Sequence, residues 1–216
     1  MVLENLLEQA FDDLQIKPDQ RESLKTYLTI IRNRDEATYK HCLRVGLLSR
    51  DIADYYGLDA KALLYAGLMH DVGKVLVDGD TLRKKENFTA EDYEKVKSHA
   101  LVGHALLAGI HEFTAAIIVR HHRYQPNPYP AELPKPKAKF SPATMQLIDM
   151  YARLLSVADF YDAAISRDNS KFGGQINSEN TEKIKELFRQ HKPDDFATAE
   201  DLLRGGILNS SYVAQA

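Results

Sequence analysis

The chain has 216 residues, a formal net charge of -3 and a single cysteine, Cys42. This length supports one domain with a sizeable core. The interspersed charges give no basic field for a long nucleic acid. A lone cysteine excludes an internal disulfide and a cysteine-based structural zinc site. Apolar runs such as 115–119 fall far short of the roughly 20 residues that span a bilayer, and residues 1–5 lack a basic signal-peptide region, so we expect a cytoplasmic protein without a membrane partner.

Two packing helices are expected at the start of the chain. Apolar residues recur at helical spacing over 3–14 and over 24–31, with a break near Pro18 between them. We interpret both as packing helices and not as a catalytic module. The predicted organisation is a short N-terminal helical extension, 1–34, that packs on the core, and one main domain, 35–216.

The next helix is expected over 38–56 and carries the first histidine of interest. Apolar residues follow His41 at +4, +7 and +11, and they are Val45, Leu48 and Ile52. Because these spacings fall on one face of a helix, His41 is predicted to lie on the buried face. Gly57 is expected to end this helix.

A short helix should then deliver an adjacent histidine and aspartate. Asp59 can cap its N-terminus, and apolar residues continue to Leu68, directly before His70 and Asp71. Neighbouring residues on a helix point about 100° apart, so the two side chains converge most easily where the helix ends. Gly73 is expected to free the backbone to turn there.

The middle of the chain adds three more histidines. A polar stretch, 78–87, is expected to separate the preceding helix from a single helix over 89–110. His99 falls inside that helix. A further apolar segment leads into the adjacent His121 and His122.

A proline-rich segment and a long helix follow. Six of the eight prolines lie within 124–143, which predicts a loop. A helical pattern over 143–166 brings Asp159 and Asp162 to its later turns. Two more helices are expected over 181–190 and 194–205. Strand-like alternation is rare along the chain, so the predicted fold class is all-α.

Seven side chains of metal-ligand type are thus spread over helical segments. They are His41, His70, Asp71, His99, His121, His122 and Asp159. A carboxylate has two oxygens and an imidazole offers one nitrogen, so Asp71 is the natural bridge between two ions. Two ions about 3.5–4 Å apart can turn a bridging water into hydroxide near neutral pH and neutralise a phosphoryl group under in-line attack. This arrangement is typical of a phosphohydrolase.

The order His41, His70-Asp71, Asp159 resembles the H…HD…D signature of HD-domain metal-dependent phosphohydrolases. The additional His99 and His121-His122 make it similar to the HD-GYP branch, whose members are all-α enzymes that open cyclic di-GMP. The resemblance covers roughly 36–165. It implies an HD-domain helical bundle, a catalytic role for Asp71 and Lys74, and a phosphodiesterase activity.

The resemblance also implies a role for individual residues. One metal would be held by His41, His70 and Asp159, the other by His99, His121 and His122, with Asp71 bridging them. Lys74, in an HDxGK motif, would contact the scissile phosphate. Asp162 would orient a ligand or its helix. Gly103, four residues after His99, would leave room beside the metals.

Five imidazoles and two carboxylates are too rich in nitrogen for magnesium or calcium and suit iron, manganese, zinc or nickel. The resemblance favours iron or manganese, as two divalent or mixed-valent transition-metal ions per chain. Members with three metals carry a glutamate one turn before the first histidine, where this chain has Ala37. We therefore expect two ions.

The loop after the histidine doublet departs from the family pattern. It reads Arg123-Tyr124-Gln125-Pro126-Asn127-Pro128-Tyr129-Pro130, and only the final Tyr-Pro matches. Family contacts made by this loop therefore do not carry over to this chain. Arg123 and Tyr124 adjoin ligands and are candidate substrate-facing residues. Arg44, one turn after His41, is a candidate for binding a phosphate or an aspartate.

The leading hypothesis is a phosphohydrolase acting on a small phosphorylated substrate, a nucleotide or cyclic dinucleotide phosphoester. A second hypothesis is an HD-type di-iron oxygenase, and a third is a non-catalytic nucleotide-sensing module with an altered loop. The complete ligand set argues against the third. The sequence leaves a homo-oligomer open.

Overall fold

The computed structural model describes residues 2–84, 86–166, 180–209 and 212, and every regular element in these ranges is helical. The all-α prediction is therefore confirmed. The longer helices are α1 (Val2–Asp13), α2 (Pro18–Arg34), α3 (Glu36–Tyr55), α4 (Ala60–Met69), α6 (Ala90–Lys97), α7 (His99–Leu107), α8 (Glu112–Ile118), α9 (Pro142–Ser166), α10 (Thr181–His191) and α11 (Phe196–Arg204). The short ones are α5 (Gly79–Arg83), η1 (Val72–Leu76), η2 (His121–Arg123), η4 (Pro193–Asp195) and η5 (Ile207–Asn209).

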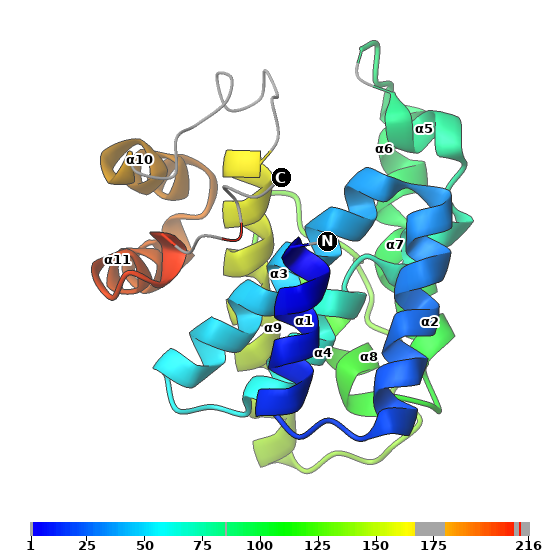
Figure 1. The fold of residues 1–216 in the computed structure, drawn as a ribbon. Coiled ribbons are helices and arrows are strands. Elements are labelled where there is room, and N and C mark those ends of the chain that lie inside the picture. Colours follow the sequence, from blue (N-terminus) through cyan, green and yellow to red (C-terminus); the bar gives the residue numbers. More distant parts are fainter. Residues whose placement is uncertain (1, 85, 167–179, 210–211, 213–216) are drawn as a thin grey trace.

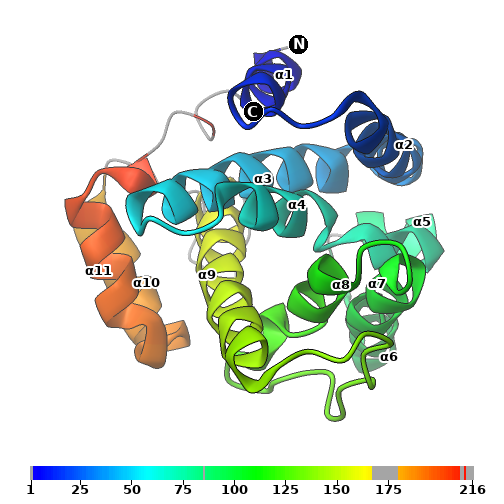
Figure 2. The ribbon, with the colours of Figure 1, turned by 90° about the horizontal axis from the view of Figure 1, so that it is seen from below.

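Helix α3 lies at the centre of the bundle. Helices α1, α2, α4 and α9 all pack against it (Figure 1). Figure 2 shows α1 and α2 on one side of α3, while α9 crosses on the other side, between the α5–α8 group and the α10–α11 pair. Side chains of α1 and α2, such as Phe11 and Leu24, are buried in the same core as those of α3 and α9. The N-terminal helices therefore pack on α3, the element that carries His41.

Helices α3 and α4 approach closely because glycines face each other between them. A Cβ added to Gly67 would lie 2.7 Å from the Cα of Gly46 and 2.8 Å from the carbonyl oxygen of Val45. Only a residue without a side chain permits this separation. The close contact sets the distance between His41, on α3, and His70, directly after α4.

Aspartate caps fix where both of these helices begin. The side chain of Asp35 accepts a hydrogen bond from the Thr38 amide at 2.7 Å, and that of Asp59 accepts one from the Ala62 amide at 3.0 Å. The predicted cap at Asp59 is confirmed. Each cap satisfies an amide that the helix leaves free, and so defines the register of the helix that follows.

One sequence-based expectation about the middle of the chain was wrong, and the structure adds a short helix that sequence analysis did not predict. The expected single helix over 89–110 is divided into α6 and α7 at Ser98, whose hydroxyl donates to the Lys95 carbonyl at 2.6 Å and so competes with the helical pattern. The polar stretch contains α5, because Asp78 caps it through the Thr81 amide at 2.8 Å. The division at Ser98 allows α7 to pack against η1 and α8 while α6 contacts α5.

The remaining expectations about the second half hold. The proline-rich segment before α9 contains no helix after η2, and α9, α10 and α11 lie where helical periodicity predicts them. Among the described residues, no helix combines the length and the apolar character needed to cross a membrane.

Candidate metal centre

Five histidines and two aspartates that are far apart in the sequence form one cluster. They come from α3, the end of α4, the first residue of α7, the turn η2 and the second half of α9. Three overlapping groups have ligand atoms within 4.8 Å of one another and could hold a metal ion. The groups are His99, His121 and His122; His41, His70 and Asp71; and His70, His121 and Asp159. The structure thus brings all seven predicted ligands together.

Asp71 lies between the two sides of the cluster. Its Oδ2 lies 3.4 Å from His70 Nε2 and 3.8 Å from His41 Nε2. Its Oδ1 lies 3.3 Å from His99 Nε2. Each carboxylate oxygen therefore faces a different set of imidazoles, which is the arrangement that a bridging ligand requires.

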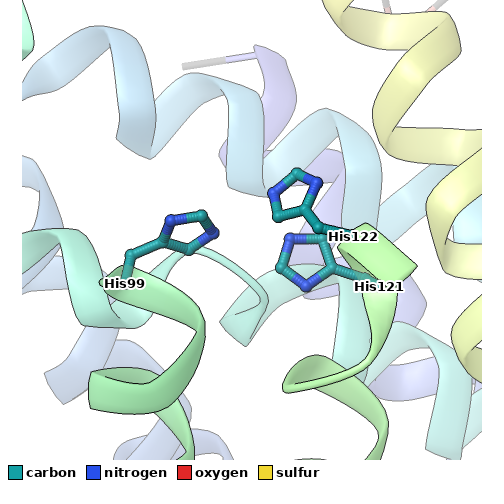
Figure 3. Close-up of side chains that lie close together, drawn as sticks. All are labelled: His99, His121 and His122. Carbon is teal, nitrogen blue, oxygen red and sulfur yellow. The ribbon is translucent and has the colours of Figure 1, made fainter. Parts of the chain in front are cut away.

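The other side of the cluster is made of imidazoles alone (Figure 3). His99 projects from the start of α7 toward His121 and His122, which lie next to each other with ring centroids 3.8 Å apart. The His99 centroid lies 5.5 Å from that of His121 and 5.1 Å from that of His122. Three nitrogen donors thus surround one small volume.

The backbone holds three of the histidine rings in place. In each of them Nδ1 donates to the carbonyl oxygen three residues earlier in the chain. The pairs are His70 with Gly67 at 2.8 Å, His99 with Val96 at 2.6 Å, and His121 with Ile118. A carbonyl oxygen only accepts, so Nδ1 carries a proton in each ring and Nε2 is the nitrogen that can bind a metal.

Asp162 holds His41 in the same way and joins it to Arg44. Its Oδ2 lies 2.6 Å from His41 Nδ1, and Arg44 donates to Oδ1 and Oδ2 at 2.7 and 3.0 Å. Burial alone would raise the pKa of Asp162, but the bonds with His41 and Arg44 lower it to about 2, so the carboxylate is ionised. Arg44 therefore has an aspartate as its partner, which is one of the two roles expected for it.

The free Nε2 atoms face one another and face carboxylate oxygens. His41 Nε2 lies 3.2 Å from His70 Nε2 and 3.0 Å from Asp159 Oδ1. Nε2 of His99 and of His121 is buried without a hydrogen-bond partner in the described part of the chain. Because acceptor atoms this close repel one another, a cation or an extra proton must lie between them. The donor set therefore fits a transition-metal ion.

The electrostatics keep the cluster ready to bind a cation. Burial lowers the pKa of His99 to about 4 and that of His121 to about 3, and it also lowers the pKa of His122. These rings are neutral at pH 7, the form that binds metals. Burial alone would raise the pKa of Asp71, but the Lys74 ammonium together with the His70 and His99 imidazoles outweighs burial and holds the pKa well below 3.8.

Lys74 lies beside the carboxylate at the middle of the cluster. Its Nζ lies 2.6 Å from Asp71 Oδ2, and its side chain is 14% exposed. The turn η1, which carries Lys74, packs against α7. Lys74 therefore combines a contact with the cluster and access to solvent.

Gly73 is required for a close approach of two backbones. A Cβ at Gly73 would lie 2.0 Å from the His99 carbonyl oxygen and 2.6 Å from the Gly103 amide nitrogen. Sequence analysis explained this glycine by freedom to turn, whereas the structure shows that it makes room for α7. Gly103 lies on the other side of this contact, and the atoms nearest to a Cβ there belong to Ile118, Val72 and Gly73.

We expect Gly73→Ala to destabilise the fold by about 3 kcal/mol, because an added methyl group must displace the backbone of α7. Chemical denaturation followed by circular dichroism measures this change. Gly79→Ala is a matched control, since its Cβ would meet only the flexible end of the Arg83 side chain, at 2.8 Å. Equal stability of the two variants would contradict the packing role of Gly73.

Arg123 and Tyr124 do not join the cluster. Arg123 donates to the Pro130 carbonyl at 2.7 Å, and the Tyr124 hydroxyl donates to the Asp149 carbonyl at 3.0 Å. Both line a separate cavity of about 580 Å³, beside Lys192, and no residue of the cluster lines that cavity. Their expected contact with substrate at the metal centre has no support in this geometry.

Tyr129 is a neighbour of the cluster that sequence analysis gave no role. Its ring packs on His122 with centroids 4.4 Å apart and lies 6.0 Å from that of His99. The Tyr129 amide also donates to the His122 carbonyl at 3.3 Å. The one signal for this residue was the Tyr129-Pro130 match to the family motif.

Comparison with known proteins places the chain in a family. The HD domain family matches residues 38–164. The chain therefore belongs to the HD domain family, as its histidine and aspartate order predicted. The match begins within α3 and ends within α9, and so includes all seven residues of the cluster.

Several similar proteins are phosphodiesterases of cyclic dinucleotides. The cyclic di-GMP phosphodiesterase response regulator RpfG of Xanthomonas campestris pv. campestris is 28% identical over 160 residues, covering 70% of this chain and 40% of the relative. A cyclic di-GMP phosphodiesterase of Thermotoga maritima is 29% identical over 165 residues, covering 73% of this chain and 40% of the relative. The 3'3'-cGAMP-specific phosphodiesterase 2 of Vibrio cholerae is 26% identical over 166 residues, covering 71% of this chain and 30% of the relative. The chain thus spans less than half the length of these relatives.

Proposed function

We propose that the chain is a metal-dependent phosphohydrolase that cleaves a phosphodiester bond in a nucleotide or cyclic dinucleotide. The observation that carries the proposal is the convergence of imidazole Nε2 atoms and ionised carboxylate oxygens at distances that need a metal ion or a proton between them. Membership of the HD domain family and similarity to cyclic dinucleotide phosphodiesterases support it.

In this proposal two ions are held by the seven residues of the cluster, with Asp71 shared between them. Bound metal would lower the pKa of a water and neutralise negative charge on the phosphoryl group. The protein itself positions the donors: the carbonyls behind His70, His99 and His121 fix their tautomers, and Asp162 fixes that of His41.

Lys74 supplies the positive charge that the protein adds at the reacting phosphate. Its ammonium lies on Asp71 Oδ2 at 2.6 Å and is held there before substrate arrives. A preorganised charge in a poorly solvated site stabilises the charge that develops in the transition state, without reorganisation during the reaction. We propose that Lys74 donates a hydrogen bond to a non-bridging phosphoryl oxygen.

The donor set favours particular metals. Five imidazoles and two carboxylates suit iron, manganese, zinc or nickel. The one cysteine in the chain, Cys42, is buried and is not part of the cluster, so the donor set contains no thiolate. We propose iron or manganese as the resident ions.

Elemental analysis of protein purified without oxygen, followed by turnover assays, tests this function. We expect about two transition-metal ions per chain and hydrolysis of a phosphodiester such as bis(p-nitrophenyl) phosphate or a cyclic dinucleotide. Removal of the metal by a chelator should abolish the activity, and adding iron or manganese should restore it.

The same assays distinguish the rival functions. Oxygen consumption with a non-phosphorylated substrate, and no phosphodiester turnover, would favour the di-iron oxygenase. Less than one metal ion per chain together with no turnover of either phosphodiester would contradict both enzyme functions and favour a sensing module.

A further inference from the structure

A cleft of about 480 Å³ opens beside the metal centre, on the side of Lys74. Besides Lys74, which touches Asp71, it is lined by Arg44, Lys40, Lys84 and Phe88. This volume is in the range of pockets that hold a whole small molecule and far exceeds that of one phosphate group. A ligand in this cleft would therefore extend outward from the cluster.

The cleft is cationic although the chain as a whole carries a net charge of -3. Four of its lining residues are basic, and Asp35 is the one acidic residue among them. The Asp35 carboxylate is already engaged, since it accepts hydrogen bonds from the Thr38 amide and hydroxyl, both at 2.7 Å. The lining therefore favours an anion over a cation.

Three of the four basic side chains have carboxylate partners. Arg44 pairs with Asp162, Lys74 with Asp71, and Lys84 with Asp92 at 2.6 Å. Lys40 differs: it is exposed and has neither a hydrogen bond nor an ion pair with any residue that the structure describes. No described residue therefore competes with an anion in the cleft for this ammonium.

The cleft also has an apolar part. Phe88 is 44% exposed and lines it together with Leu82 and Val96. An aromatic ring at the surface of a cationic cleft suits a ligand that combines negative charge with a flat ring, because bases stack on aromatic side chains. A nucleotide has both features.

We propose that this cleft binds a second phosphate of the substrate, with Lys40 as its contact and Phe88 against a base, while the first phosphate lies at the metal centre. The inference rests on the proposed function and narrows it. The preferred substrate carries two phosphates, as a cyclic dinucleotide does, and a substrate with one phosphate would leave Lys40 unused.

Lys40→Glu tests the proposal with two substrates that differ in phosphate number. We expect the KM for cyclic di-GMP to rise by about tenfold or more, as loss of a charged hydrogen bond predicts, while kcat and metal content stay near wild-type values. The KM for bis(p-nitrophenyl) phosphate, which has one phosphate, should change by less than about twofold. Phe88→Ala should likewise raise the KM for cyclic di-GMP alone.

Lys183→Glu, an exposed substitution at the start of α10, is the control for net charge and should change neither KM. Equal effects of Lys40→Glu on both substrates, or no effect on either, would overturn the proposal. Isothermal titration calorimetry with cyclic di-GMP measures binding directly, and so separates failure of the cleft proposal from failure of the proposed phosphohydrolase function. If the wild type cleaves neither compound, binding that Lys40→Glu weakens still supports the cleft, whereas no binding, or equal binding by both proteins, rejects it.

Discussion

Asp71→Ala is expected to lose both metal and activity. Asp71 is 1% exposed and its two oxygens face different sets of histidines, so no neighbouring side chain can replace it in the proposed role of shared ligand. Metal content should fall below about one-tenth of the wild-type value and turnover by more than about 100-fold, because loss of a direct ligand exceeds the 10- to 100-fold cost of losing an outer partner. Elemental analysis and a phosphodiester assay measure the two effects.

Asp80→Ala is the control for this substitution, since the Asp80 side chain is 99% exposed on α5. It should keep wild-type metal content and turnover. Circular dichroism should show that Asp71→Ala remains folded, because its effect is local to the cluster. Substantial activity in folded Asp71→Ala protein would show that this carboxylate is not a shared ligand.

Asp162→Ala should weaken both the fold and the metal centre. The change leaves the guanidinium of Arg44, a residue that is 5% exposed, without its carboxylate partner. Breaking such a pair costs about 3–5 kcal/mol, because a charge stays buried without compensation. His41 also loses the acceptor that fixes its tautomer, so metal affinity should fall by about 10- to 100-fold. Urea denaturation and metal titration measure the two losses.

The double variant Arg44→Met with Asp162→Leu separates these effects. Replacing both charges by apolar groups should recover most of the lost stability, since no unpaired charge remains. Metal affinity should stay low, because leucine has no acceptor for the Nδ1 proton of His41 and the methionine thioether is only a weak one. Recovery of stability and affinity together would mean that Asp162 acts on the metal centre only through the fold. Glu94→Ala, which breaks an exposed ion pair with Lys97, should have little effect on either quantity.

Most of the cluster was predictable because the helical spacing of apolar residues places the histidines and aspartates on buried faces or at helix ends, where side chains of metal-ligand type can meet. The spacing of Val45, Leu48 and Ile52 after His41 predicts a buried histidine, and His41 is 1% exposed. The cap at Asp59 and the apolar run behind it predict a helix that ends beside His70, and α4 ends at Met69. Local rules were sufficient here because the residues of the cluster lie on regular elements or at their ends.

Features that depend on tertiary packing were not predictable. No local pattern shows that the His99 carbonyl meets Gly73, because the two are brought together by α7 packing on η1. The cleft residues Lys40, Lys84 and Phe88 belong to separate segments, and each on its own resembles an ordinary surface residue. The loop after His122 has few periodic signals, so the sequence does not show that Arg123 bonds to the Pro130 carbonyl within the same loop and not to the cluster.

The hydrogen bonds from His70, His99 and His121 to the carbonyls three residues behind them affect how the centre tolerates mutation. A main-chain acceptor is present whatever side chain occupies position 96 or 118. Substitution of Val96 or Ile118 can therefore change packing without removing the partner that orients the ring, whereas position 67 is restricted to glycine by the contact with α3. His41 is the only one of these four histidines whose ring is oriented by a side chain. Among the acceptors that orient the four rings, Asp162 is therefore the one that a single substitution can remove.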